Sequence, residues 1–119
     1  MLQRKYRLKK YSAFIATYKK NNAVSDNNVC IYFGKEKTSM DTNTKFAFVV
    51  SKKIHKRAVI RNRIKRLMRE NIRLYLKNNE YPEVNKYMSI IFVAKKDAVG
   101  VDYKTLHNSI NTLLLKKLK

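Results

Sequence analysis

The sequence predicts an α+β fold, a two-layer sandwich in which three helices pack on a mixed sheet of about four strands. The apolar periodicity alternates between that of helices and that of strands, in the order helix, strand, strand, helix, strand, helix, with room for one further short strand. The chain has 119 residues, 45% of them apolar, which suffices for one hydrophobic core. We therefore expect a single domain over residues 1–119.

The first two elements are short. Residues 11–20 predict a helix, because Phe14 and Tyr18 share one of its faces and Ser12 is a candidate N-cap. The Asn-rich segment that follows is typical of turns. Within it, Ala23 and Val24 indicate a brief strand.

Three further strands follow from composition. Residues 29–33 (VCIYF) are β-branched and aromatic, and we interpret Cys30 as a small buried hydrophobe rather than a reactive thiol. Residues 46–51 predict a second strand, antiparallel to the first because the two are consecutive. Residues 88–94 (MSIIFVA) are nearly all apolar, which predicts a strand at the centre of the sheet.

Residues 58–77 predict the longest helix, which has two opposite faces. Its apolar face includes Asn71 together with Ile60, Ile64, Leu67, Met68, Leu74 and Tyr75. Its opposite face is polar and basic, with Asn62, Lys65, Arg66, Arg69 and Arg73 at its centre and Arg61 and Arg63 on the flanks. One helix thus presents a core stripe and a separate cationic stripe.

The last helix is predicted from its cap and its apolar stripe. Asp102 is placed to cap its N-terminus, and four residues repeat at helical spacing on the inward face: Leu106, Ile110, Leu113 and Leu114. His107 falls outside that stripe, so we expect it at the helix surface.

Positive charge is the strongest functional signal. The chain has 28 Lys or Arg and 8 Asp or Glu, a formal balance of +20, and nine of the cations lie in residues 52–70. Such like charges repel one another unless a polyanion meets them, which favours nucleic acid over an anionic membrane or an acidic protein. No apolar run is long enough to span a bilayer and no secretory signal begins the sequence, so we expect a soluble, cytoplasmic protein.

The residue pattern offers no catalytic centre of the protein's own. Its eight acids are scattered, without pairs at strand or helix spacing that could hold Mg²⁺. His55 and His107 have no Cys or acid at metal-ligand spacing, and His55 lies in a basic run where contact with phosphate or solvent is expected. We therefore expect no catalytic residue and no metal ligand on the protein.

Residues 57–70 (RAVIRNRIKRLMRE) closely resemble the signature helix of the bacterial ribonuclease P protein family, with its Arg-Asn-Arg and Ile-Lys-Arg centre. The segments RLKKYSAFIATYKK, VCIYF, FVVSKK and MSIIFVAKK resemble the family's N-terminal helix and strands, so the likeness covers nearly the whole chain. Tyr18 stands where Phe is common, which keeps the aromatic ring.

The resemblance implies a non-catalytic protein that assembles with ribonuclease P RNA, which supplies the catalytic centre and holds its Mg²⁺. The holoenzyme hydrolyses precursor tRNA to free the mature 5′ end, and the fold includes a left-handed parallel crossover. No membrane and no obligate protein partner are implied.

The resemblance also assigns roles to residues of this chain. Ribonuclease P RNA is expected to bind the basic helix, at Arg57, Arg61, Asn62, Arg63, Lys65, Arg66 and Arg69. The single-stranded 5′ leader of precursor tRNA is expected in a cleft between sheet and N-terminal helix, at Phe14, Tyr18, Tyr32, Lys52 and Lys53. From periodicity alone, ordinary packing of these three aromatic side chains is the competing interpretation.

Other functions stay open from the residues alone. A structural, ribosome-associated RNA-binding protein would have similar size and charge. A protein-only metal nuclease would need the acid cluster that the sequence lacks. Membrane-surface binding would compete with the core for the apolar faces of the helices.

Overall fold

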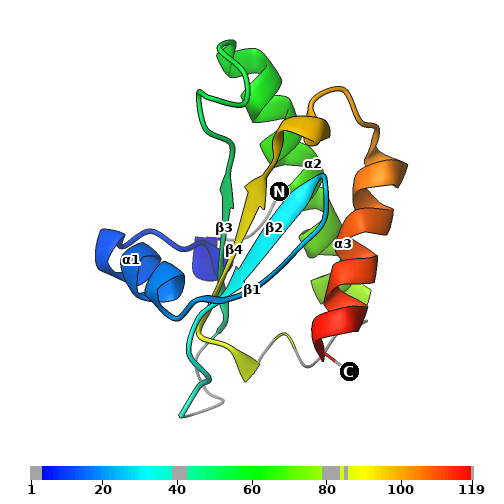
Figure 1. The fold of residues 1–119 in the computed structure, drawn as a ribbon. Coiled ribbons are helices and arrows are strands. Elements are labelled where there is room, and N and C mark those ends of the chain that lie inside the picture. Colours follow the sequence, from blue (N-terminus) through cyan, green and yellow to red (C-terminus); the bar gives the residue numbers. More distant parts are fainter. Residues whose placement is uncertain (1–3, 39–42, 79–83, 85, 119) are drawn as a thin grey trace.

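The computed structural model describes residues 4–38, 43–78, 84 and 86–118 (Figure 1). The helices are η1 (Arg4–Tyr6), α1 (Tyr11–Lys19), α2 (Ala58–Asn78), η3 (Lys96–Ala98) and α3 (Tyr103–Leu118). The strands are β1 (Asn22–Ser25), β2 (Val29–Phe33), β3 (Lys45–Val49) and β4 (Ser89–Ala94). The predicted α+β architecture, with its brief first strand, is confirmed.

The four strands form one mixed sheet in the order β1-β2-β4-β3. β2 pairs antiparallel with β1 and with β4, whereas β3 pairs parallel with β4, so that Ile31 and Phe48 both lie opposite Phe92. The parallel pair β3 and β4 is joined through α2, which is the crossover that the family resemblance implies. The left-handedness of this crossover stays a prediction.

The prediction that β2 and β3 pair directly with each other is wrong, although they do run in opposite directions as predicted. β4 lies between them and pairs with both. The reason is burial: five of the six residues of β4 are buried, because its two faces are covered by different helices. A strand of that composition is most stable at the centre, as predicted for residues 88–94.

α2 and α3 cover one face of the sheet, and α1 lies on the other (Figure 1). The main core lies between the sheet and α2 and α3. Its fully buried large side chains are Ile31, Phe33, Phe46, Ile64, Met68, Ile90, Phe92, Leu106, Ile110 and Leu114. The four predicted inward positions of α3 are all buried. The face toward α1 is less covered, since Cys30, Tyr32, Val49 and Val93 are only half-buried.

The apolar stripe of α2 is confirmed in part. Ile64, Met68, Asn71 and Tyr75 are buried as predicted. The other three predicted positions, Ile60, Leu67 and Leu74, are only half-buried. Because α2 contacts both β3 and α3, its buried face is wider than the predicted stripe. The additional buried position is Ile72.

The start of α1 differs from the prediction. Lys10 occupies the N-cap and no side chain caps the helix, so Ser12 lies inside the first turn rather than at the cap. The helix is fixed to the sheet instead by the buried Thr17, whose hydroxyl lies 2.5 Å from that of Ser89 on β4. Tertiary contact thus replaces local capping.

α3 begins at its predicted cap, because the Asp102 carboxylate accepts a hydrogen bond of 2.8 Å from the Thr105 amide. This hydrogen bond lowers the pKa of Asp102. His107, expected at the helix surface, is half-buried and has partners on both helices. Its Nδ1 donates to Asn71 Oδ1 at 2.7 Å, and its ring stacks on Tyr103, so it joins α3 to α2.

Replacing Asn71 with Ala should lower the free energy of unfolding by about 1–3 kcal/mol, because a buried donor loses its acceptor. Asn71 is fully buried and accepts from His107, while its amide donates to the Leu67 carbonyl at 2.9 Å. Urea unfolding measures the change. The control is Asn62→Ala, an exposed position on the same helix, and equal losses in both variants would contradict a joining role for Asn71.

Candidate nucleic-acid interface

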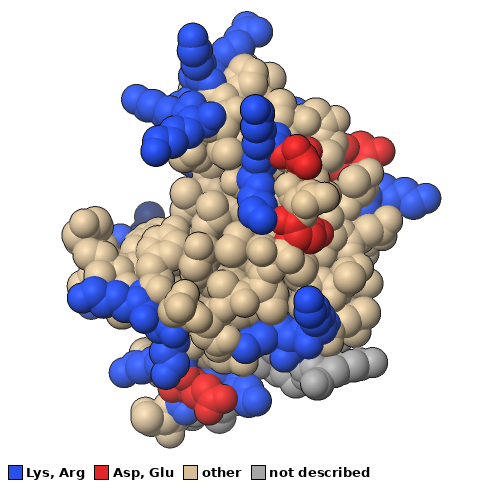
Figure 2. Space-filling view, viewed as in Figure 1, with Lys and Arg blue, Asp and Glu red and all other residues tan. Residues whose placement is uncertain are grey.

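The basic residues of α2 form a face that stays on the protein surface. Asn62 and Arg66 are exposed, and four others are half-buried: Arg61, Arg63, Lys65 and Arg69. Arg57, just before the helix, is exposed too. Figure 2 shows Lys and Arg side chains gathered over the N-terminal end of α2 and the turn that precedes it. The predicted cationic stripe is therefore a real surface, hereafter the α2 basic face.

These cations sit at the end of the helix that disfavours them. The N-terminus of a helix carries partial positive charge, which stabilises acids and repels bases. The first turn of α2 nevertheless contains no acid, and its N-terminal half holds Arg61, Arg63, Lys65 and Arg66. The same arrangement is favourable for an incoming phosphate, because the backbone amides and the side chains attract it together.

Two of the arginines also shape the turn and the packing of the helix. The guanidinium of Arg61 donates to the carbonyls of His55 at 2.9 Å and Lys56 at 2.7 Å. The guanidinium of Arg63 donates to the Val101 carbonyl at 3.3 Å. His55, expected to meet phosphate or solvent, is half-buried, and its Nδ1 accepts the Arg57 amide at 3.1 Å.

Within the part of the chain that the structure describes, no acid forms an ion pair with the α2 basic face. Within the described residues, the ion pairs are Arg73 with Glu70 at 2.6 Å and Lys86 with Glu36 at 3.9 Å. Hydrogen bonding to Arg73 lowers the pKa of Glu70 and raises that of Arg73. The acid on α2 is thus matched to Arg73, outside the Arg61–Arg69 stretch.

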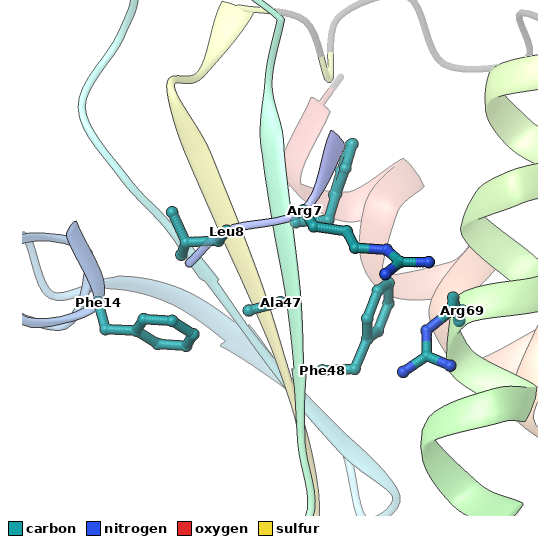
Figure 3. A pocket seen from close by; sticks show the side chains of 7 residues that line it. Arg7, Leu8, Phe14, Ala47, Phe48 and Arg69 are labelled. Atoms are coloured by element: carbon teal, nitrogen blue, oxygen red, sulfur yellow. The ribbon is translucent and has the colours of Figure 1, made fainter. Parts of the chain in front are cut away.

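A cavity of about 230 Å³ connects the α2 basic face to the edge of the sheet at β3 (Figure 3). Phe14 and Leu8 approach it from one side of β3, and Arg7, Phe48 and Arg69 line it from the other. The Arg69 guanidinium lies 5.8 Å from the centre of the Phe48 ring. An aromatic ring flanked by two guanidinium groups suits a stacked base and its phosphate.

The remaining predicted aromatic residues meet on the other side of the sheet from α2. The rings of Tyr18 and Tyr32 pack edge to face at 4.9 Å, so the packing interpretation holds for their mutual contact. Both keep accessible surface: Tyr18 is 37% exposed and Tyr32 is half-buried. Burial raises the pKa of Tyr18, and a hydrogen bond with the Cys30 side chain raises that of Tyr32. Cys30 itself is half-buried, less than expected.

Lys52 and Lys53 lie apart from these rings. They are exposed in the turn that links β3 to α2, next to the α2 basic face. The structure therefore divides the five expected leader residues among three places: Phe14 at the β3 cavity, the Tyr18–Tyr32 pair, and the lysines at the turn.

The sequence prediction missed Arg7, Leu8 and Phe48. Arg7 forms a parallel bridge with Phe46, and the Leu8 amide donates to the Phe46 carbonyl at 2.8 Å, which carries the N-terminal segment across the outer edge of β3. Nothing in local composition indicates that contact. For Phe48 a signal existed, since strand alternation places it beside the buried Phe46 and in reach of α2.

Two other kinds of feature are absent from the described residues, a metal-binding cluster and a membrane-spanning helix. In that part of the chain, His, Cys, Asp and Glu nowhere gather in the threes that hold a metal ion. Across the same residues, no helix combines the length and apolar character needed to cross a membrane.

The fold and this surface define a small, basic α+β protein of the RNA-binding class. The sequence model of the ribonuclease P family matches residues 2–119. The chain therefore belongs to the ribonuclease P protein family, which confirms the resemblance seen in residues 57–70.

Relatives and solved structures agree. The ribonuclease P protein component of Clostridium kluyveri is 35% identical over 111 residues, covering 93% of each chain. That of Alkaliphilus oremlandii is 37% identical over 110 residues, covering 92% of this chain and 89% of the relative. The RNase P protein of Staphylococcus aureus superposes with a TM-score of 0.75 at 27% identity, covering 96% of this chain and 98% of its own. The protein from Thermotoga maritima, at 21% identity and a TM-score of 0.72, shares the fold.

Replacing Arg61 with Lys should loosen the turn before α2 while keeping the charge. A lysine cannot reproduce the planar fork that reaches two carbonyls, so we expect a loss of about 1 kcal/mol in unfolding free energy and faster amide exchange near the turn. Hydrogen exchange and urea unfolding measure both. Arg66→Lys, at an exposed position of the same helix, is the control, and it should change neither quantity.

Proposed function

We propose that the chain is the protein subunit of ribonuclease P and promotes endonucleolytic removal of the 5′ leader from precursor tRNA. The observation that carries the proposal is the un-neutralised α2 basic face, present in a member of this family. Polyanion binding would supply the counter-charge that the described acids do not give this face.

The catalytic RNA is the proposed partner of the α2 basic face. Arg57, Arg63, Lys65, Arg66 and Arg69 would contact its phosphates, and Asn62 would donate or accept at its sugars or base edges. Arg61 also has a structural role, because its guanidinium donates hydrogen bonds to the His55 and Lys56 carbonyls. It holds the neighbouring cations in position.

The single-stranded leader is the proposed ligand of the aromatic residues on the α1 side. Phe14 would stack a base at the β3 cavity, and the exposed parts of Tyr18 and Tyr32 would offer a second platform. Lys52 and Lys53 at the turn would meet phosphates between the leader and the catalytic RNA.

Hydrolysis itself is assigned to the RNA. The RNA subunit would hold Mg²⁺, which would supply Lewis-acid activation of the attacking water and charge stabilisation at the leaving oxygen. The protein's part is to bind, to orient the substrate and to reduce phosphate repulsion where the two RNAs approach. This work would take place in the cytoplasm, with precursor tRNA as substrate and with no membrane or obligate protein partner.

Reconstitution tests the proposal directly. The purified protein, added to its cognate ribonuclease P RNA, should restore cleavage of precursor tRNA at Mg²⁺ concentrations too low for the RNA alone, because added cations replace counterions that the RNA lacks. Gel analysis of the released leader is the measurement. Cleavage by the protein without RNA would point to a protein nuclease.

Failure to stimulate cleavage at any Mg²⁺ concentration would contradict the proposal. If the protein then co-purified with ribosomal RNA instead, a ribosome-associated structural role would replace it.

Tyr32→Ala and Phe14→Ala should weaken holoenzyme binding to precursor tRNA by about 1–3 kcal/mol each, the usual value of one base stacked on an aromatic ring. Binding to mature tRNA, which has no leader, should not change. Tyr32→Phe keeps the ring and serves as the control. Equal losses for precursor and mature tRNA would favour the packing interpretation.

A further inference from the structure

A second cavity lies on the other flank of α1, away from the proposed leader residues. Its volume is about 570 Å³, within the range of small-ligand sites. None of Phe14, Tyr18, Tyr32, Lys52 or Lys53 lines it. Its apolar floor includes Leu8, Ala13, Ala16 and Met88, and we refer to it as the Met88 cavity.

The floor of the Met88 cavity is held rigidly by the sheet. The Met88 amide donates to the Lys35 carbonyl at 2.9 Å, and the Met88 carbonyl accepts from the Lys45 amide at 3.0 Å. The side chain of Met88 is nevertheless 37% exposed. Gly34 lines the floor without a side chain, because a Cβ there would lie 2.3 Å from the Ser89 hydroxyl.

Lysines surround this apolar floor. The cavity is lined by Lys19 at the end of α1, Lys20 at its C-cap, Lys35 after β2 and Lys45 at the start of β3, and by no acid. The nearest acid in sequence, Glu36, is paired with Lys86 at 3.9 Å. In the view of Figure 2, Lys and Arg side chains also gather below α1. An apolar floor within a ring of cations matches a nucleotide, whose base is flat and whose phosphate is anionic.

The Met88 cavity adjoins the interface already described. A third cavity, of about 430 Å³, shares Leu8, Ala13 and Lys45 with it and shares Arg7 and Leu8 with the β3 cavity. Its other lining residues are cationic: Arg4, Lys5, Lys9 and Lys10. A cation-lined path thus leads from Arg69 on α2, around the N-terminal end of α1, to Met88.

We infer that the Met88 cavity binds the 5′-distal part of the precursor leader, upstream of the nucleotides stacked at Phe14, Tyr18 and Tyr32. The inference rests on the proposed function. Continuity of the path favours the same RNA strand as occupant, and the cation ring with its apolar floor favours an unpaired nucleotide over a duplex. Leaders long enough to reach the cavity gain affinity there, and short leaders do not.

The test compares holoenzymes on precursors with leaders of about 5 and about 15 nucleotides, near the short and long ends of common single-strand site sizes. Lys20→Ala with Lys35→Ala should weaken binding of the long-leader precursor about tenfold. It should also reduce the salt slope by about 1.4, since each single-strand phosphate that a cation neutralises contributes about 0.7. Ala16→Glu, which places a carboxylate at an exposed lining position, should have the same selective effect.

The matched control is Lys104→Ala with Lys116→Ala, which removes equal charge from exposed positions of α3 across the sheet. It should leave the long-leader preference unchanged. Equal losses on both leader lengths, or losses in neither, would overturn the inference while leaving stimulated cleavage by the wild-type holoenzyme intact. A wild-type protein that stimulates cleavage of neither precursor would instead overturn the proposed function.

Discussion

The structure depends on the anchoring of α2, which holds like charges together against their mutual repulsion. Ile64 and Met68, fully buried on one side of the helix, fix the rotation that turns Lys65 and Arg66 outward. Apolar burial of this kind contributes roughly 1.5–3 kcal/mol per large side chain. The positive end of the helix dipole and the absence of acids in the first turn both oppose this arrangement. A polyanionic partner is attracted both by the clustered cations and by the positive end of the helix dipole.

The rest of the fold extends that surface around the molecule. Because β4 occupies the centre of the sheet, β3 lies at its edge, where the N-terminal segment pairs with it at Arg7 and Arg69 of α2 lines the same cavity. α1 crosses the opposite face, where Thr17 fixes it to Ser89. The cavities along α1 and the basic face of α2 therefore adjoin, although their residues come from distant parts of the sequence.

Local signals in the sequence were sufficient to predict the main helices and strands and the α2 basic face. Strand composition, the Asp102 cap and the apolar stripe of α3 act within a few residues, and the structure agrees with each. Composition indicated a central place for β4, but its insertion between β2 and β3, the half-buried His107–Asn71 contact and the approach of Arg7 to Phe46 are tertiary outcomes. Their energies depend on partners far along the chain, so periodicity could not indicate them. The family resemblance supplied the crossover and the roles of the site residues, which no spacing implied.

The most direct measurement is the salt dependence of binding to ribonuclease P RNA by a protein in which Lys65, Arg66 and Arg69 are replaced by Gln. We expect an unfolding free energy that does not fall, because the variant removes mutually repelling charges, and a slope of log Kd against log salt reduced by about 0.7–0.9 for each phosphate that the variant no longer neutralises. The control replaces Lys96, Lys104 and Lys116, exposed on η3 and α3, and should alter the slope far less. Equal slopes for the triple variant and the wild type would contradict the central claim that this face of α2 binds the RNA.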